Sequence, residues 1–147
     1  MTVPVFVDTN VLVYARDATE GEKRAGASAW LTHLWENRTG RVNYQVLEEY
    51  YVTVTRKLRP GLAPADARAD VRNLLAWGPL PFDAEILESA WRLESRWDLS
   101  FWDAAIVAAA RASGCEHLLT EDLTDGQTMG GVTVLNPFVH APGSADD

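Results

Sequence analysis

The sequence predicts an α/β fold of three layers, in which a mainly parallel central sheet of about four to five short strands is flanked by helices. Short apolar runs alternate along the chain with longer segments of helical periodicity. The first run ends at Asp8 and is apolar at every position, as expected for a strand covered on both faces. Because the strands are separated by helices, a parallel sheet with helices on its faces is the natural arrangement.

The elements of the first half follow from apolar spacing and from turn residues. Val3–Tyr14 begins as the apolar strand, and Thr9 and Asn10 then open a helical pattern. Pro60-Gly61 ends the last helix of this half. The expected elements are a short helix beginning at Asn10, a helix over Glu22–Asn37, a short strand over Arg41–Asn43 and a helix over Gln45–Leu58.

The second half shows the same alternation. Pro64 suits the first turn of a helix, and Gly114 suits the position just after a helix. One domain over residues 1–140 is expected, with a loose C-terminal tail over 141–147. The expected elements are a helix over Pro64–Trp77, an edge strand over Leu80–Phe82, a helix begun by Asp83 and running to Trp97, a helix over Ser100–Ser113, and strands over Leu118–Thr120 and Val132–Leu135.

The composition is that of a soluble globular domain. The 147 residues are 47% hydrophobic and 23% charged, and no apolar run reaches the roughly 18 residues that a bilayer span needs. The N-terminus lacks a basic-then-apolar signal pattern, and the single cysteine, Cys115, fits a reducing compartment. We therefore expect a cytoplasmic protein with no membrane partner.

The formal net charge of −8 excludes a protein that binds nucleic acid through a broad basic surface. A polyanionic substrate would have to be drawn in locally, by a metal ion or by a small basic cluster.

Acidic residues follow the predicted strands. Asp8 ends the first strand, Asp122 follows Leu118–Thr120, and the pair Glu48-Glu49 lies in the first turns of the helix after Arg41–Asn43. In a parallel sheet, strand ends and the starts of the following helices share one edge. Simpler roles exist, since Asp8 could only cap a helix and Asp122 could be a solvated loop acid.

Asp103 lies in the first turn of a nearly apolar helix. Its spacing puts it on one face with Ile106, Val107 and Ala110, where a carboxylate would need a partner or a metal. Ser100-x-x-Asp103 also fits a capping box, which explains the position but not a buried carboxylate.

Four carboxylates at one edge would repel one another without cations. An all-oxygen site of this kind suits Mg²⁺ or Mn²⁺. Such an ion can orient a phosphodiester and lower the pKa of a bound water that attacks phosphorus. The acidic residues therefore indicate phosphoryl chemistry.

The chain resembles the PIN-domain ribonucleases, and among them the VapC-type toxins of toxin–antitoxin pairs. The resemblance lies in VFVDTNVLVY, QVLEEYYVTVTRKL, LSFWDAAIVAAA and LLTEDLTDGQ, in this order. It implies a PIN-like fold, a Mg²⁺-dependent endoribonuclease (Mn²⁺ as a possible substitute), an RNA substrate, a VapB-type antitoxin and a homodimer. The residues that it implies for the metal site are Asp8, Glu49, Asp103 and Asp122, with Thr9 and Asn10 in support and Asp125 as a further or alternative ligand.

Spacing alone leaves Glu48 and Glu49 equivalent, and the family pattern L-x-E-[FY] favours Glu49. Asn43-Tyr44 stands where such sequences often carry a small hydroxyl residue, so one supporting hydrogen bond is in question. Arg56 and Lys57, with Arg16 near the first turn, are candidates for gripping RNA phosphates, although each could be a solvated surface charge.

Two other functions are compatible with parts of the pattern. A PIN-like fold could act only as a catalytically silent binding module, but loss of an acid would be expected there. A phosphatase with a phospho-aspartyl intermediate also starts from a strand-terminal Asp, yet it needs a second Asp where Asn10 stands.

Overall fold

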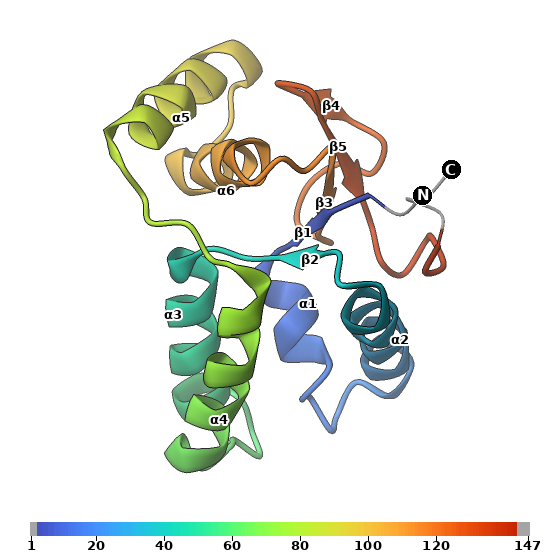
Figure 1. Cartoon of the computed structure of the whole chain (residues 1–147). Coiled ribbons are helices and arrows are strands. Elements are labelled where there is room, and N and C mark those ends of the chain that lie inside the picture. The colour runs from blue at the N-terminus through green and yellow to red at the C-terminus, as the bar shows by residue number, and fades with distance from the viewer. Residues whose placement is uncertain (1–2, 144–147) are drawn as a thin grey trace.

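A five-stranded sheet separates two layers of helices in the computed structural model, which describes residues 3–143 (Figure 1). The strand order is β2-β1-β3-β5-β4. The first four strands pair in parallel and β4 pairs antiparallel with β5, which confirms the predicted fold class. The strands are β1 (Val5–Val7), β2 (Gly40–Arg41), β3 (His117–Leu119), β4 (Thr128–Met129) and β5 (Val132–Leu135).

The helices form one layer on each side of this sheet (Figure 1). The first layer holds α1 (Thr9–Tyr14), α2 (Gly21–Asn37), α3 (Tyr44–Val52) and α4 (Pro64–Leu74). The second layer holds α5 (Ala84–Trp97) and α6 (Phe101–Ala112). Two short helical turns, η1 (Thr53–Lys57) and η2 (Leu75–Trp77), extend α3 and α4.

The sheet has a topological switch point between β1 and β3. From β1 the chain crosses to β2 on one side through α1 and α2, and it later reaches β3 on the other side of β1 after α6. The segments that leave β1 and β3 therefore diverge, and open α/β sheets bind ligands in the crevice at such a point.

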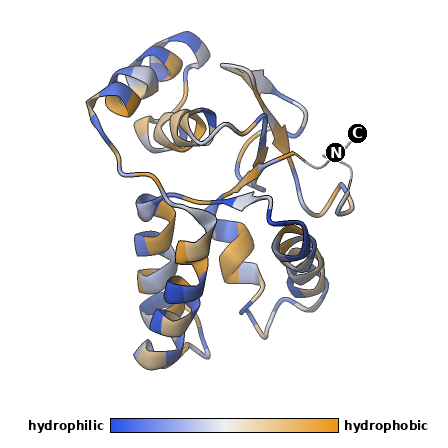
Figure 2. Cartoon of the chain, viewed as in Figure 1, coloured by the Kyte–Doolittle hydropathy of each residue, from blue (hydrophilic) through white to orange (hydrophobic). Residues whose placement is uncertain are grey.

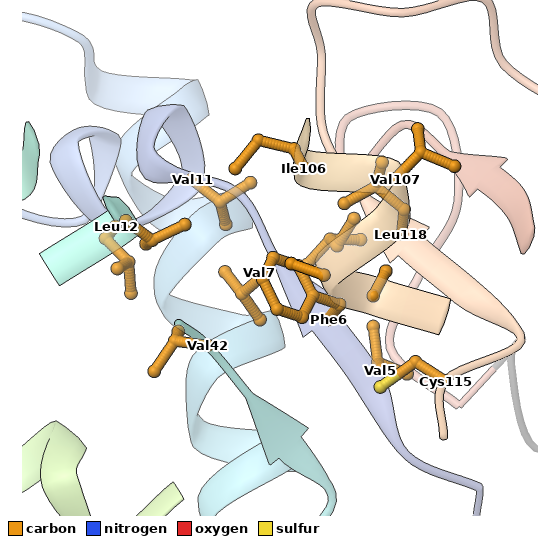
Figure 3. Close-up of a cluster of buried hydrophobic side chains, with 14 of the residues drawn as sticks. Val5, Phe6, Val7, Val11, Leu12, Val42, Ile106, Val107, Cys115 and Leu118 are labelled. Atoms are coloured by element: carbon orange, nitrogen blue, oxygen red, sulfur yellow. The ribbon is translucent and has the colours of Figure 1, made fainter. Parts of the chain in front are cut away.

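The core is built on β1, whose three residues are all buried. Phe6 and Val7 lie between Val11 of α1 and Val107 of α6, so β1 contacts both helical layers (Figure 3). Figure 2 shows the same distribution, with β1 and β5 coloured as hydrophobic and the short edge strand β2 pale. In α6, every residue from 104 to 110 is buried, because this helix packs between the sheet and α5.

Two predicted strands differ from the structure, and one strand of the structure was not predicted. The strand predicted over Arg41–Asn43 is β2 (Gly40–Arg41), because Asn43 instead caps α3 by accepting a hydrogen bond from Val46 N at 2.9 Å. The strand predicted over Leu80–Phe82 is a single bridge at Leu80, since the flanking prolines have no N–H to donate. Strand β4 was not predicted.

The helix predicted over Gln45–Leu58 leaves α-helical geometry at Thr53. Leu58 N donates to Thr53 O at 2.9 Å, which closes a π-helical turn. The Thr55 hydroxyl donates to Tyr51 O at 2.7 Å and thereby competes for a helical carbonyl. The end of this segment is therefore wider than an α-helix.

The predicted tail over 141–147 lies mostly outside the described residues, which end at 143. The segment before it is attached to α2, because Trp30 Nε1 donates to Pro137 O at 3.2 Å and to His140 O at 2.9 Å. No helix within residues 3–143 is long and apolar enough to cross a membrane.

Candidate functional site

Asp8 occupies the end of β1 and also begins α1. Its Oδ1 accepts a hydrogen bond from Thr9 N at 2.8 Å, so the side chain is the N-cap of α1. Its Oδ2 accepts from the Thr120 hydroxyl at 2.9 Å and lies 3.3 Å from Asn10 Nδ2. Capping uses one carboxylate oxygen, and the other faces residues that follow β3.

Asn10 joins the ends of β1 and β3. Its Nδ2 lies 2.9 Å from Thr120 Oγ1 and 3.2 Å from Asp122 Oδ2, while its Oδ1 accepts from Glu121 N at 3.2 Å. That last bond fixes which way the amide points, because only the oxygen can accept from a backbone N–H. Asp8 and Asp122 therefore both lie within hydrogen-bond distance of one amide nitrogen.

Thr120 is the buried centre of this arrangement, with a relative exposure of 0%. Its hydroxyl donates to Asp8, accepts from Asn10 and also accepts from Asp122 N at 3.1 Å. Sequence reasoning missed this role. The available signal was a hydroxyl residue at the end of the β3 run, two positions before an acid.

Glu49 reaches the site from α3. Its Oε2 accepts from the Thr9 hydroxyl at 2.9 Å, and its Oε1 accepts from Gln45 Nε2 at 3.2 Å. Glu48 instead lines a hollow of about 330 Å³ on the outer face of α3 and α4, beside Tyr44. The structure therefore brings Glu49, and not Glu48, to the end of β1.

Asp103 lies in the first turn of α6, where its backbone N–H donates to the Ser100 hydroxyl at 3.1 Å. Its side chain is half-buried rather than enclosed, which corrects the expectation of a buried face. Asp103 approaches the site from the second helical layer, and its charge acts on Asp122. Within residues 3–143, no group donates a hydrogen bond to its carboxylate.

Burial raises the pKa of Asp8 from 3.8 to about 6, against the hydrogen bonds from Thr120 and Thr9 that favour the charged form. The charges of Asp122 and Glu49 add to this rise. The pKa of Asp122 is also raised, first by burial and then by the charges of Glu121 and Asp103, while Asn10 opposes the shift. The site thus disfavours its own negative charge.

The donor chemistry fits a hard divalent cation. Asp8, Glu49, Asp103 and Asp122 offer only oxygen, and within the described residues no Lys or Arg forms an ion pair with any of them. No three Asp, Glu, His or Cys side chains of residues 3–143 converge closely enough to form a cation cage as they stand. Thr9, Asn10 and Thr120 instead link the acids by hydrogen bonds.

Asp125 and Arg16 lie apart from this group. Asp125 Oδ1 accepts from Asn136 N at 2.9 Å, and its carboxylate pairs with His140 Nε2 at 2.9 Å. Arg16 makes a two-pronged ion pair with Asp70, at 2.6 and 2.9 Å. Both side chains therefore have structural partners away from the four acids.

Arg56 and Lys57 are exposed at the end of η1, beyond the α3 segment that carries Glu49. Lys23, which lies near Arg16 around the first turn and was grouped with it from the sequence as a candidate for binding RNA phosphates, pairs with Glu121 beside the site. No local pattern signals this pair, because its partners are separated by almost a hundred residues.

The sequence profile of the PIN domain matches residues 5–124, which covers β1 to the loop after β3. No curated protein sequence matches the chain.

Solved structures with the same fold include toxin–antitoxin proteins. A toxin–antitoxin complex from Klebsiella pneumoniae is 20% identical, with a TM-score of 0.64 over 90% of this chain and 97% of that one. VapBC2 from Rickettsia felis, bound to a DNA fragment from their promoter, is 17% identical, with a TM-score of 0.62 over 90% of this chain and 97% of that one. VapC20 of Mycobacterium tuberculosis, a sarcin–ricin loop cleaving toxin, is 26% identical, with a TM-score of 0.55 over 78% and 86%.

Proposed function

The chain belongs to the PIN domain family, and we propose that it is a metal-dependent endoribonuclease, the VapC-type toxin of a toxin–antitoxin pair. One observation carries the proposal. Asn10 links Asp8 to Asp122 at the switch point of the sheet, and Thr9 links Glu49 to the same place. Acids from three separate elements are thus linked through Thr9 and Asn10 at the end of the sheet where α/β proteins bind ligands.

Asp8, Glu49, Asp103 and Asp122 would hold Mg²⁺, with Mn²⁺ as a substitute. A bound cation would polarise the phosphodiester and lower the pKa of the water that attacks phosphorus. The protein's own contribution is orientation. Thr120 and Asn10 hold the acids that follow β1 and β3 by hydrogen bonds, and the side chains would have to draw closer together around a bound cation.

The partners in this proposal are an RNA substrate and a VapB-type antitoxin, and the active form is a homodimer in the cytoplasm. The toxin–antitoxin proteins among the similar structures support the antitoxin. The sarcin–ricin loop cleaving toxin among them supports RNA as the substrate.

The test is RNA cleavage by purified, antitoxin-free protein with Mg²⁺, with and without EDTA. We expect Asp8→Asn to lower the rate by at least about a hundredfold, because a single misplaced or missing oxygen in such a site has effects of this order. Asp125→Asn is the control, since Asp125 lies in the same loop as Asp122 but pairs with His140 instead of joining the four acids. Activity that survives both EDTA and Asp8→Asn would identify a contaminating nuclease, and an inactive wild type on many RNAs would indicate a binding module.

We further propose that Arg56 and Lys57 attract RNA phosphates, because both are exposed and Arg16 is already paired with Asp70. Reversing both charges should raise KM. It should also make the plot of log affinity against log salt concentration shallower, by about one to two in slope. An unchanged salt dependence would remove this role.

A further inference from the structure

Beside the acidic site, three side chains form a cluster that joins two helices to the loop after β3. Lys23 Nζ of α2 lies 2.8 Å from Glu121 Oε2. The Tyr14 hydroxyl of α1 donates to Glu121 Oε1, and Lys23 Nζ lies 3.4 Å from the Tyr14 oxygen. We call Tyr14, Lys23 and Glu121 the outer clamp.

The outer clamp binds the side chain of Glu121, and residues of the acidic site bind the backbone of the same segment. Glu121 N donates to Asn10 Oδ1 at 3.2 Å, and Asp122 N donates to Thr120 Oγ1 at 3.1 Å. The chain segment that carries Asp122 is therefore attached on both sides, by side chains of the site and by the outer clamp.

Lys23 is itself fixed in place. Its ammonium group lies 4.9 Å from the ring centre of Tyr14 and 5.5 Å from that of Phe138. Tyr14 and Phe138 pack edge to face, with ring centres 5.3 Å apart. These contacts restrain a side chain that would otherwise sample many rotamers, so its ion pair costs less entropy than an isolated surface pair.

The outer clamp also limits repulsion within the loop. Glu121 directly precedes Asp122, so two carboxylates lie close together in the loop. The Glu121 carboxylate lies 2.8 Å from the Lys23 ammonium group and also accepts the hydrogen bond from Tyr14. Lys23 thus offsets a charge that would otherwise push the Asp122 carboxylate away.

We propose that Lys23 and Tyr14 are positioning residues, which act through Glu121 to hold Asp122 where RNA cleavage requires it. The inference rests on the proposed nuclease function. An ordinary surface pair would not have this effect, because exposed ion pairs contribute little and do not hold a backbone segment in place. A Lys that gripped RNA directly would act on substrate binding instead.

The test compares Lys23→Met with the conservative Lys23→Arg and with Arg24→Met, which removes the same charge from the next, exposed position of α2. We expect Lys23→Met to lower kcat by about tenfold or more with KM within about twofold, as displacement of a reacting group does. Lys23→Arg and Arg24→Met should stay within about twofold of the wild type, and Tyr14→Phe should lower kcat in the same direction as Lys23→Met.

A second measurement needs no activity. Amide hydrogen exchange at residues 121 and 122 of the metal-free protein should become about threefold faster or more in Lys23→Met and stay unchanged in Arg24→Met, because both amides are hydrogen-bonded only while the loop is held. Unchanged exchange would overturn the inference. So would a rise in KM with a weaker salt dependence and constant kcat, which would make Lys23 an RNA contact. If the wild type were inactive but exchange were faster in Lys23→Met, the nuclease function would be refuted, while the role of the outer clamp in holding the loop would be supported.

Discussion

Replacing Asp8 with Asn should make the metal-free protein more stable at neutral pH, although it removes a residue of the candidate site. The pKa of Asp8 is about 6 in the folded protein and 3.8 as a free side chain. At a pH between these two pKa values, Asp8 has lost its proton in the unfolded chain but retains it in the folded protein. Stability therefore falls as the pH rises from about 4 to 6 and stays low above that range.

The loss in free energy of unfolding follows from the size of the shift in the pKa of Asp8. A rise of about two pKa units corresponds to about 3 kcal/mol at most, since one unit is about 1.4 kcal/mol. Asn resembles the protonated carboxyl group in shape and can still cap α1. We expect Asp8→Asn to raise the free energy of unfolding by about 1–3 kcal/mol at pH 7–8, with the gain vanishing near pH 4.

The assay is denaturant unfolding in EDTA from pH 4 to pH 8. Asp125→Asn is the control of opposite sign, because backbone and His140 hydrogen bonds lower the pKa of Asp125. Its ionised form contributes stability above the unfolded pKa, and this contribution is lost as the pH falls, so Asp125→Asn should destabilise the protein at neutral pH. Added Mg²⁺ should stabilise the wild type more than Asp8→Asn. An Asp8→Asn protein that is less stable than wild type at pH 7, or a difference independent of pH, would refute the reasoning.

Substitutions at three further places, each with its own expected outcome, test the site and the core. Glu49→Gln should lower RNA cleavage by about a hundredfold, whereas Glu48→Gln should change it less than about threefold, and the reverse ranking would exclude the present assignment. Thr120→Val should cost about 1–3 kcal/mol in denaturant unfolding, because it leaves buried donors without their acceptor, and Thr120→Ser should restore most of that loss. Gly40→Ala should cost about 1–3 kcal/mol, since its Cβ would lie 2.5 Å from the buried Trp77 ring; wild-type stability would show that this ring can move.

Features that depend only on residues close together in the sequence were predicted. The apolar run of β1 and the Asp that follows it are visible directly, because a strand covered on both faces has no polar positions. Asp83 and Ser100 cap α5 and α6 as expected, since a cap is a contact between residues three positions apart. The resemblance to the PIN domain family came from the same local segments, and the family profile confirms it.

Some local signals were present but were not used. Strand β4 turns into β5 through Gly130 and Gly131, both with positive φ, which is a typical two-residue hairpin connection. The prolines around Leu80 were a reason to expect no strand there.

Other features were decided by the tertiary structure alone. Glu48 and Glu49 are equivalent in helical spacing, and only the approach of Thr9 to α3 distinguishes them. The sequence alone left Arg16 available to bind phosphate, whereas in the structure it forms an ion pair with Asp70 of α4.

The sequence by itself determined the α/β class and the positions of the strand-terminal acids, because these depend on residue type and on the periods of helix and strand. The tertiary structure decided which polar groups meet, as in the bond between Asn10 and Asp122, which are 112 positions apart. The physical reason is strand order. Once β3 lies beside β1, the residues that follow both strands must share one edge, and no local pattern contains that order.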